Sequence, residues 1–121
     1  MARRTIINRV ITDALVDTTA VVATHLYEDI SLAVKYERVS GAGAGRLYVY
    51  GAMDVNANTK YLIGFYPNQT GTRDTDGLVA WTTSLNIVLQ IPGIHPYIYL
   101  SWDETTDPAR FTVDLLGVET Y

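Results

Sequence analysis

The chain has 121 residues, no cysteine, and 13 acidic against nine basic side chains, which gives a formal net charge of −4. This length suits one domain that can bury a core without covalent cross-links. The absence of cysteine excludes disulfides, a thiolate nucleophile and a cysteine-ligated zinc site. No basic block stands out, which argues against duplex nucleic acid as a partner.

The N-terminus carries Arg3 and Arg4 but not the apolar run of a signal peptide, because Asn8 and Asp13 interrupt it. No stretch is long and apolar enough to span a bilayer. We therefore expect a protein that is made in a cytoplasm and has no membrane partner.

Residues 4–12 alternate imperfectly and predict a first strand. We interpret residues 1–16 as an N-terminal strand or arm and residues 17–121 as the main domain. Two roles stay open for the first strand: an arm that pairs with a neighbouring subunit, or an ordinary edge strand.

Most of the remaining chain alternates between apolar and polar residues or is rich in threonine and valine, which predicts further strands. These runs lie at residues 18–26, 32–37, 46–50, 61–65, 78–83, 85–91, 97–102 and 111–115. Between them we interpret residues 28–31 as a turn, residues 40–45 as a flexible glycine-rich connection and residues 67–77 as a long polar loop. Residues 116–121 are a tail that continues the last strand.

The last two runs form the clearest hairpin. Alternate residues of each run are apolar, and the polar segment 103–110 joins the two runs. About eight short strands with regular turn signals predict an all-β fold, a two-sheet antiparallel sandwich. Jelly-roll-like and immunoglobulin-like arrangements both fit, and the jelly roll is slightly favoured.

Catalytic chemistry has little support in the sequence. Only His25 and His95 could serve as a base next to a nucleophile, and there is no Gly-x-Ser-x-Gly elbow. We expect no enzymatic activity. Residues 74–77 place alternate carboxylates before a glycine, as calcium loops do, but the later glutamate is missing. Asp103, Glu104 and Asp107 fit a solvated turn better than a metal site, so no metal or cofactor is expected.

Aromatic residues are the other conspicuous group. If the aliphatic faces of their strands are core, Tyr48, Tyr50, Tyr97 and Tyr99 point outward. Such a stripe favours protein contact, because tyrosine buries a large ring while keeping a polar tip. A sugar-binding face that includes Trp81 or Trp102 is the alternative.

Residues 39–54, with their glycine-rich loop and the strand Arg46–Tyr50, lead to the aromatic strand Tyr61–Phe65. Together with the closing hairpin of Tyr97–Trp102 and Phe111–Gly117, they resemble small β-sandwich proteins of tailed bacteriophage particles. Ala52-Met53 and Asn56-Ala57-Asn58 depart from that pattern.

The resemblance implies a structural protein of the virion without catalytic residues. Such proteins include capsid decoration (cement) proteins, minor capsid proteins, and tail or neck accessory proteins. The implied partners are further copies of the chain and major capsid or other virion proteins. We expect the contacts to involve the four tyrosines and the segment Arg3, Arg4, Thr5, Ile6 and Ile7. A carbohydrate-binding sandwich with glycan contacts at Trp81 and Trp102 remains the other possibility.

Overall fold

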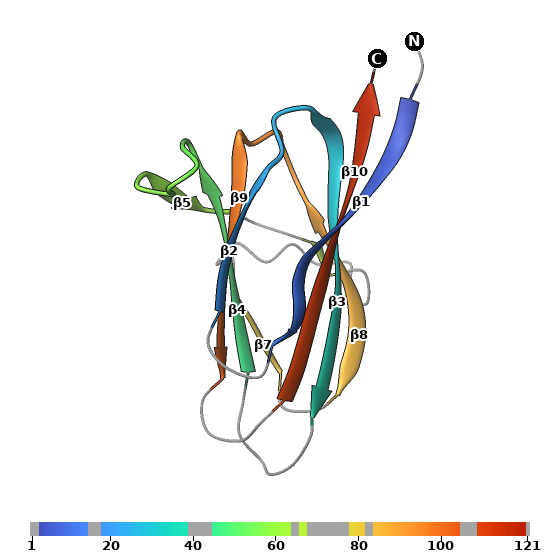
Figure 1. The fold of residues 1–121 in the computed structure, drawn as a ribbon, viewed down its shortest axis with the longest axis vertical. Helices are drawn as coiled ribbons and strands as arrows, with labels where there is room; N and C mark the ends of the chain where they lie inside the picture. The colour runs from blue at the N-terminus through green and yellow to red at the C-terminus, as the bar shows by residue number, and fades with distance from the viewer. Residues whose placement is uncertain are drawn as a thin grey trace.

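The computed structural model describes residues 3–14, 18–38, 45–63, 66–67, 78–81, 84–104 and 109–120 (Figure 1). These residues form ten strands, and none of them lies in a helix. The strands are β1 (Arg3–Ala14), β2 (Thr18–Ala23), β3 (Tyr27–Arg38), β4 (Gly45–Ala52), β5 (Lys60–Leu62), β6 (Tyr66–Pro67), β7 (Leu78–Trp81), β8 (Leu85–Ile91), β9 (Tyr97–Glu104) and β10 (Ala109–Thr120).

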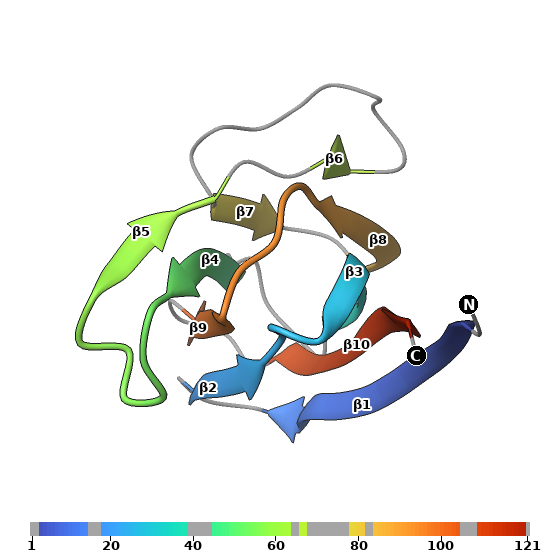
Figure 2. The ribbon, with the colours of Figure 1, turned by 90° about the horizontal axis from the view of Figure 1, so that it is seen from above.

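The strands form two antiparallel sheets that pack face to face (Figure 2). The first sheet has the order β1-β10-β3-β8-β6. The second has the order β2-β9-β4-β5. Strand β7 also pairs with β4: β7 lies opposite residues 45–48 of β4, and β5 lies opposite residues 50–52. Because β5 and β6 have only three and two residues, each sheet consists mainly of four longer strands. The predicted all-β, two-sheet sandwich is confirmed.

The strand pairing distinguishes between the two expected arrangements. Strand β1 pairs with β10, β2 with β9, β3 with β8, and β4 with β7. The first half of the chain is thus matched to the second half in reverse order, like a long hairpin rolled into a sandwich. This nested pairing is the topology of a jelly roll with two Greek keys.

Alternation in the sequence corresponds to burial in the structure. Along β9 and β10 every second side chain faces the other sheet, as the alternation in the sequence predicts. The core contains Ile98, Leu100, Trp102, Phe111, Val113 and Leu115 from these two strands, all 0% exposed, together with the alternate aliphatic residues of β3, β4 and β8. The core therefore lies between the sheets and leaves the other face of each sheet toward solvent.

An aromatic cluster joins the two sheets near the ends of β3 and β9 and the starts of β4 and β10. The ring of Trp102 on β9 stacks on Phe111 of β10, with centroids 3.8 Å apart and an angle of 3° between the planes. The Tyr36 ring on β3 meets Trp102 edge-on at 5.5 Å. Gly45 lies against this cluster, because a Cβ atom there would come within 2.1 Å of the Trp102 ring. Glycine is the residue that permits this close approach.

Strand β1 lies at the edge of the first sheet. It pairs with β10 of its own chain from Arg3 opposite Thr120 to Ala14 opposite Phe111, with two register shifts after Arg9. Residues 3–14 thus form an edge strand of the sandwich, and β10 continues to Thr120 as expected for the tail. Pairing of the outer edge of β1 with a neighbouring chain stays a prediction.

Three local predictions are wrong. The runs 97–102 and 111–115 do not form a hairpin, because β9 pairs with β2 and β4 in the second sheet, whereas β10 pairs with β1 and β3 in the first. Residues 28–31 are not a turn but part of β3, because Ile30 is buried and pairs with Ile91 on one side and Gly117 on the other. Pairing on both sides outweighs the turn-like composition of the segment. Residues 61–65 are not one strand either. The chain changes sheets there: β5 pairs with β4, and β6 pairs with β8.

Candidate functional site

The four tyrosines that the sequence analysis selected lie on the outer side of the second sheet, and we call them the tyrosine face. Tyr48 and Tyr50 come from β4, and Tyr97 and Tyr99 come from β9. All four are half-buried, whereas their chain neighbours point into the core. Tyr50 lies opposite Tyr99 in the antiparallel register. The predicted outward stripe is therefore one continuous surface.

Aromatic rings of the tyrosine face contact one another. The Tyr48 and Tyr50 rings stack at 6.4 Å with 12° between their planes, and Tyr50 contacts Tyr99 at 5.9 Å. The Lys60 ammonium lies 4.6 Å from the centroid of Tyr99 and 5.7 Å from that of Tyr50. Cation–π contacts of this kind contribute about 0.5–1 kcal/mol at exposed sites. The face therefore combines ordered aromatic rings with one positive charge.

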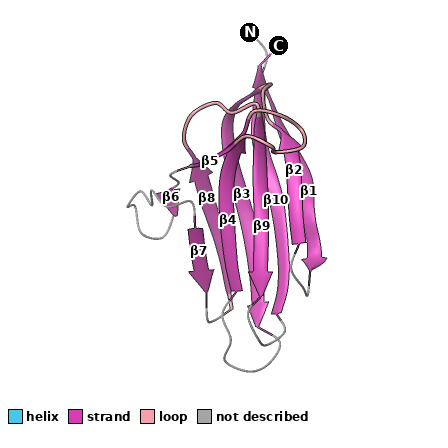
Figure 3. Cartoon of the chain, turned by 90° about the vertical axis from the view of Figure 1, so that its left-hand side faces the viewer, coloured by secondary structure: helices cyan, strands magenta, loops and turns pink. Residues whose placement is uncertain are grey.

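Three loops gather at one end of the sandwich. Tyr97, the first residue of β9, lies between Ala23 at the end of β2 and Ala52 at the end of β4. The connections 24–26, 53–59 and 92–96 follow or precede these residues, so they share this end, as Figures 1 and 3 show.

This end carries exposed apolar side chains, and we call it the apolar end. Ile94 is 70% exposed, and Leu26 and Val55 are each 61% exposed. Every large hydrophobic side chain that is exposed in the described part of the chain lies on these loops or on the adjoining β5: Leu26, Met53, Val55, Tyr61, Leu62 and Ile94. Exposed apolar side chains gathered in one region are typical of interaction surfaces, so this end is a candidate contact surface. Isolated exposed apolar residues would be ordinary, but six at one end are not.

Hydrogen bonds fix two of these loops to each other. The Thr24 N–H donates to the Pro96 carbonyl at 3.0 Å, and the Thr24 hydroxyl donates to the His95 carbonyl at 2.7 Å. Thr24 is fully buried. The positions of Leu26 and Ile94 are thus set by the scaffold, which lowers the entropy cost of binding through them.

The third loop is closed by Asp54. Its side-chain Oδ1 accepts the N–H groups of Asn58 and Thr59 at 3.0 and 3.3 Å, and its carbonyl accepts the Ala57 N–H. Ala57 adopts a positive φ of 55° and is buried. This compact turn holds Met53 and Val55 on its outer side, where both are exposed.

His95 lies beneath the apolar end in a structural role. Its Nε2 is 2.9 Å from the Pro92 carbonyl, which only accepts, so Nε2 carries the proton in the neutral ring. Nδ1 then accepts a hydrogen bond from the Tyr61 hydroxyl at 2.9 Å. His95 is 9% exposed, whereas His25 is exposed on the loop 24–26. The Nδ1 bond therefore fastens β5 to the loop 92–96, and the Nε2 bond holds the ring within that loop.

The glycan hypothesis for Trp102 is wrong. Its side chain is fully buried between the sheets, so a sugar ring has no access to it. Trp81 lies on β7, and its side chain is outside the described residues, as are the side chains of Arg3, Arg4, Thr5, Ile6 and Ile7 on β1. Contacts through these residues stay predictions.

The candidate calcium loop 74–77 also lies outside the described residues, as does Asp107 of the second acidic group. Within the described ranges no three histidine or acidic side chains come together in a group that could hold a metal ion. The same part of the chain contains no helix long and apolar enough to cross a membrane.

The apolar end could not be predicted from the sequence. Leu26, Met53, Val55 and Ile94 lie outside the strands, where alternation gives no direction to a side chain. Their meeting depends on which strand ends are neighbours in space. The only local signal is a large apolar residue within or beside a turn, such as Ile94 next to Gly93.

The fold defines the chain as a jelly-roll sandwich with an aromatic face and an apolar end. The structure is similar to the crystal structure of SPBc2 prophage-derived protein YomS, with a TM-score of 0.64 over 97% of this chain and 96% of that chain. The sequences are 10% identical, so the likeness is one of fold. No protein-family model and no curated protein matches the sequence.

Proposed function

We propose that this chain is a non-enzymatic structural protein of a bacteriophage particle, specifically a capsid decoration (cement) or minor capsid protein. The observation that carries the proposal is the apolar end, where six large apolar side chains are exposed on hydrogen-bonded loops and the adjoining β5. The resemblance of the sequence to small virion proteins supports it, as does the fold shared with a prophage-derived protein. A tail or neck accessory protein is the nearest alternative.

The proposed mechanism is burial of apolar and aromatic area between neighbouring subunits of the particle. Complete burial of one Leu, Ile, Val or Met side chain contributes about 1.5–3 kcal/mol. Two surfaces, the tyrosine face and the apolar end, would let one copy contact two neighbours and so hold them together. Symmetry would repeat these contacts over the particle.

Serine substitutions at the apolar end test this mechanism. In the variant Leu26→Ser/Ile94→Ser we expect the protein to fold normally, because both side chains are more than half exposed. We expect its co-sedimentation with particles that lack the chain to fall at least about tenfold, which corresponds to about 1.4 kcal/mol. The measurement is the amount of added protein that sediments with the particles at several concentrations.

Leu116→Ser is the matched control, because Leu116 is half-buried on β10 of the first sheet, away from both surfaces. It should leave co-sedimentation unchanged. Alanine at Tyr48, Tyr50, Tyr97 and Tyr99 tests the second surface in the same assay. Wild-type binding that neither set of substitutions weakens would contradict the assignment of these surfaces.

A further inference from the structure

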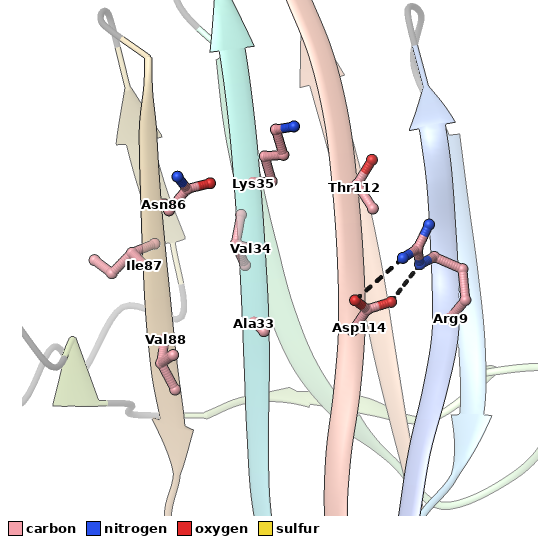
Figure 4. A pocket seen from close by; sticks show the side chains of 9 residues that line it. All are labelled: Arg9, Ala33, Val34, Lys35, Asn86, Ile87, Val88, Thr112 and Asp114. Atoms are coloured by element: carbon pink, nitrogen blue, oxygen red, sulfur yellow. Dashed lines mark hydrogen bonds and ion pairs between the residues drawn. The ribbon is translucent and has the colours of Figure 1, made fainter.

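The outer face of the first sheet carries a trough along β3 and β8. Its central part is a depression of about 300 Å³ with Ala33 as the floor (Figure 4). Val88 of β8 lies on one side of Ala33, and Thr112 and Asp114 of β10 lie on the other. The trough exists because Ala33 projects much less than the residues on both neighbouring strands.

Two more depressions extend the trough in both directions. One shares Lys35 and Asn86 with the central depression and continues to Ser84. The other begins at the pair Ser31–Gln90, which follows the pair Ala33–Val88 in the register, and continues toward Pro92; it lies along the same two strands but shares no lining residue with the central depression. At about 3.3 Å per residue, the eight steps from residue 29 to residue 37 span roughly 26 Å. This length suits an extended polymer.

The charges along the trough nearly cancel. Arg9 of β1 lies opposite Asp114 of the neighbouring strand β10 and forms two hydrogen bonds with its carboxylate: Nε donates to Oδ1, and Nη2 donates to Oδ2 at 3.4 Å (Figure 4). The Lys35 Nζ atom lies 3.9 Å from Oε2 of Glu37 on the same strand. A polyanion such as nucleic acid requires an excess of positive charge, which these ion pairs do not provide.

The remaining chemistry is that of a hydrogen-bonding surface. Amide groups of Asn86 and Gln90 and hydroxyl groups of Ser31 and Thr112 line the trough, while Ala33 and Val88 supply small apolar patches. Neutral polyhydroxylated chains offer both donors and acceptors on their hydroxyl groups and apolar faces on their rings. Side chains that both donate and accept match such a ligand.

We propose that this trough binds a neutral linear polysaccharide. The central depression is separate from the tyrosine face, because it lies on the opposite sheet, and only the depression at Ser31–Gln90 extends toward the apolar end, at Pro92. The trough therefore adds a glycan-binding activity to the proposed structural role, and it does not depend on the exposure of either tryptophan.

The substitution Ala33→Phe tests the proposal, because a phenyl ring would fill the floor while pointing away from the core. The matched control is Ala23→Phe, which adds the same ring to an exposed position on β2 of the other sheet. Purified protein is titrated against soluble neutral glucans, mannans, xylans and galactans, by calorimetry and by retardation in native gels that contain the polymer.

We expect the wild type and Ala23→Phe to bind at least one of these polymers equally, and Ala33→Phe to bind it at least about tenfold more weakly. Asn86→Ala should also weaken binding. The proposal is overturned if no polymer binds, if Ala33→Phe binds like the wild type, or if both phenylalanine variants lose binding alike. Because the assay uses no particles, its outcome is independent of the proposed virion role.

Discussion

Replacing Trp102 by alanine is expected to lower the free energy of unfolding by about 3–5 kcal/mol, the usual cost of removing a buried tryptophan side chain. The indole is 0% exposed, stacks on Phe111 and meets Tyr36 edge-on, so its removal opens a cavity between the two sheets. The total free energy of unfolding of a domain of this size is about 5–15 kcal/mol. The change is measured as the shift of the urea unfolding midpoint at constant m-value.

Trp102→Phe is the control, because a phenyl ring keeps the stacking position while leaving a smaller cavity. It should lower the free energy of unfolding clearly less than Trp102→Ala does. If the alanine variant unfolds at nearly the wild-type midpoint, Trp102 is not the residue that joins the sheets, and its accessibility to a glycan would have to be reconsidered.

The second large effect is expected at Gly45, where alanine should destabilise the protein by about 1–3 kcal/mol through overpacking. The added Cβ would lie 2.1 Å from the Trp102 ring and 2.8 Å from the Tyr36 ring. Both rings are enclosed by the core and have no room to move. Thermal and urea unfolding of Gly45→Ala measure the loss.

Gly51→Ala provides the comparison. Its Cβ would come within 2.3 Å of the Tyr61 ring, a similar overlap, but Tyr61 is 37% exposed, so its ring can move toward solvent at the cost of its hydrogen bond to His95. We therefore expect a smaller loss at Gly51 than at Gly45. The opposite order would mean that the rigidity of the contacted ring does not determine the cost.

The strands were predictable where burial of one face imposes alternation. Ile98, Leu100 and Trp102 are an example, because a shift by one residue would expose all three. The failures have a different cause. Residues 28–31 look like a turn, but Ile30 pairs on both sides within the sheet, and that pairing involves residues far away in the sequence.

The same distinction applies to the candidate surfaces. The tyrosine face follows from alternation, since Tyr48 and Tyr50 must point opposite to Leu47 and Val49. The apolar end does not, because Leu26 belongs to a loop whose position depends on which strands pair. The trough at Ala33 could not be predicted from the sequence either, because it depends on which side chains of the neighbouring strands project beyond Ala33.

Quantitative mass spectrometry of sedimented particles from a lysate of the source organism tests the central proposal most directly. The account predicts many copies of this chain per particle, in a fixed ratio to the major capsid protein. A few copies per particle would assign the chain to the neck or tail. Absence of the chain from purified particles would contradict the virion role.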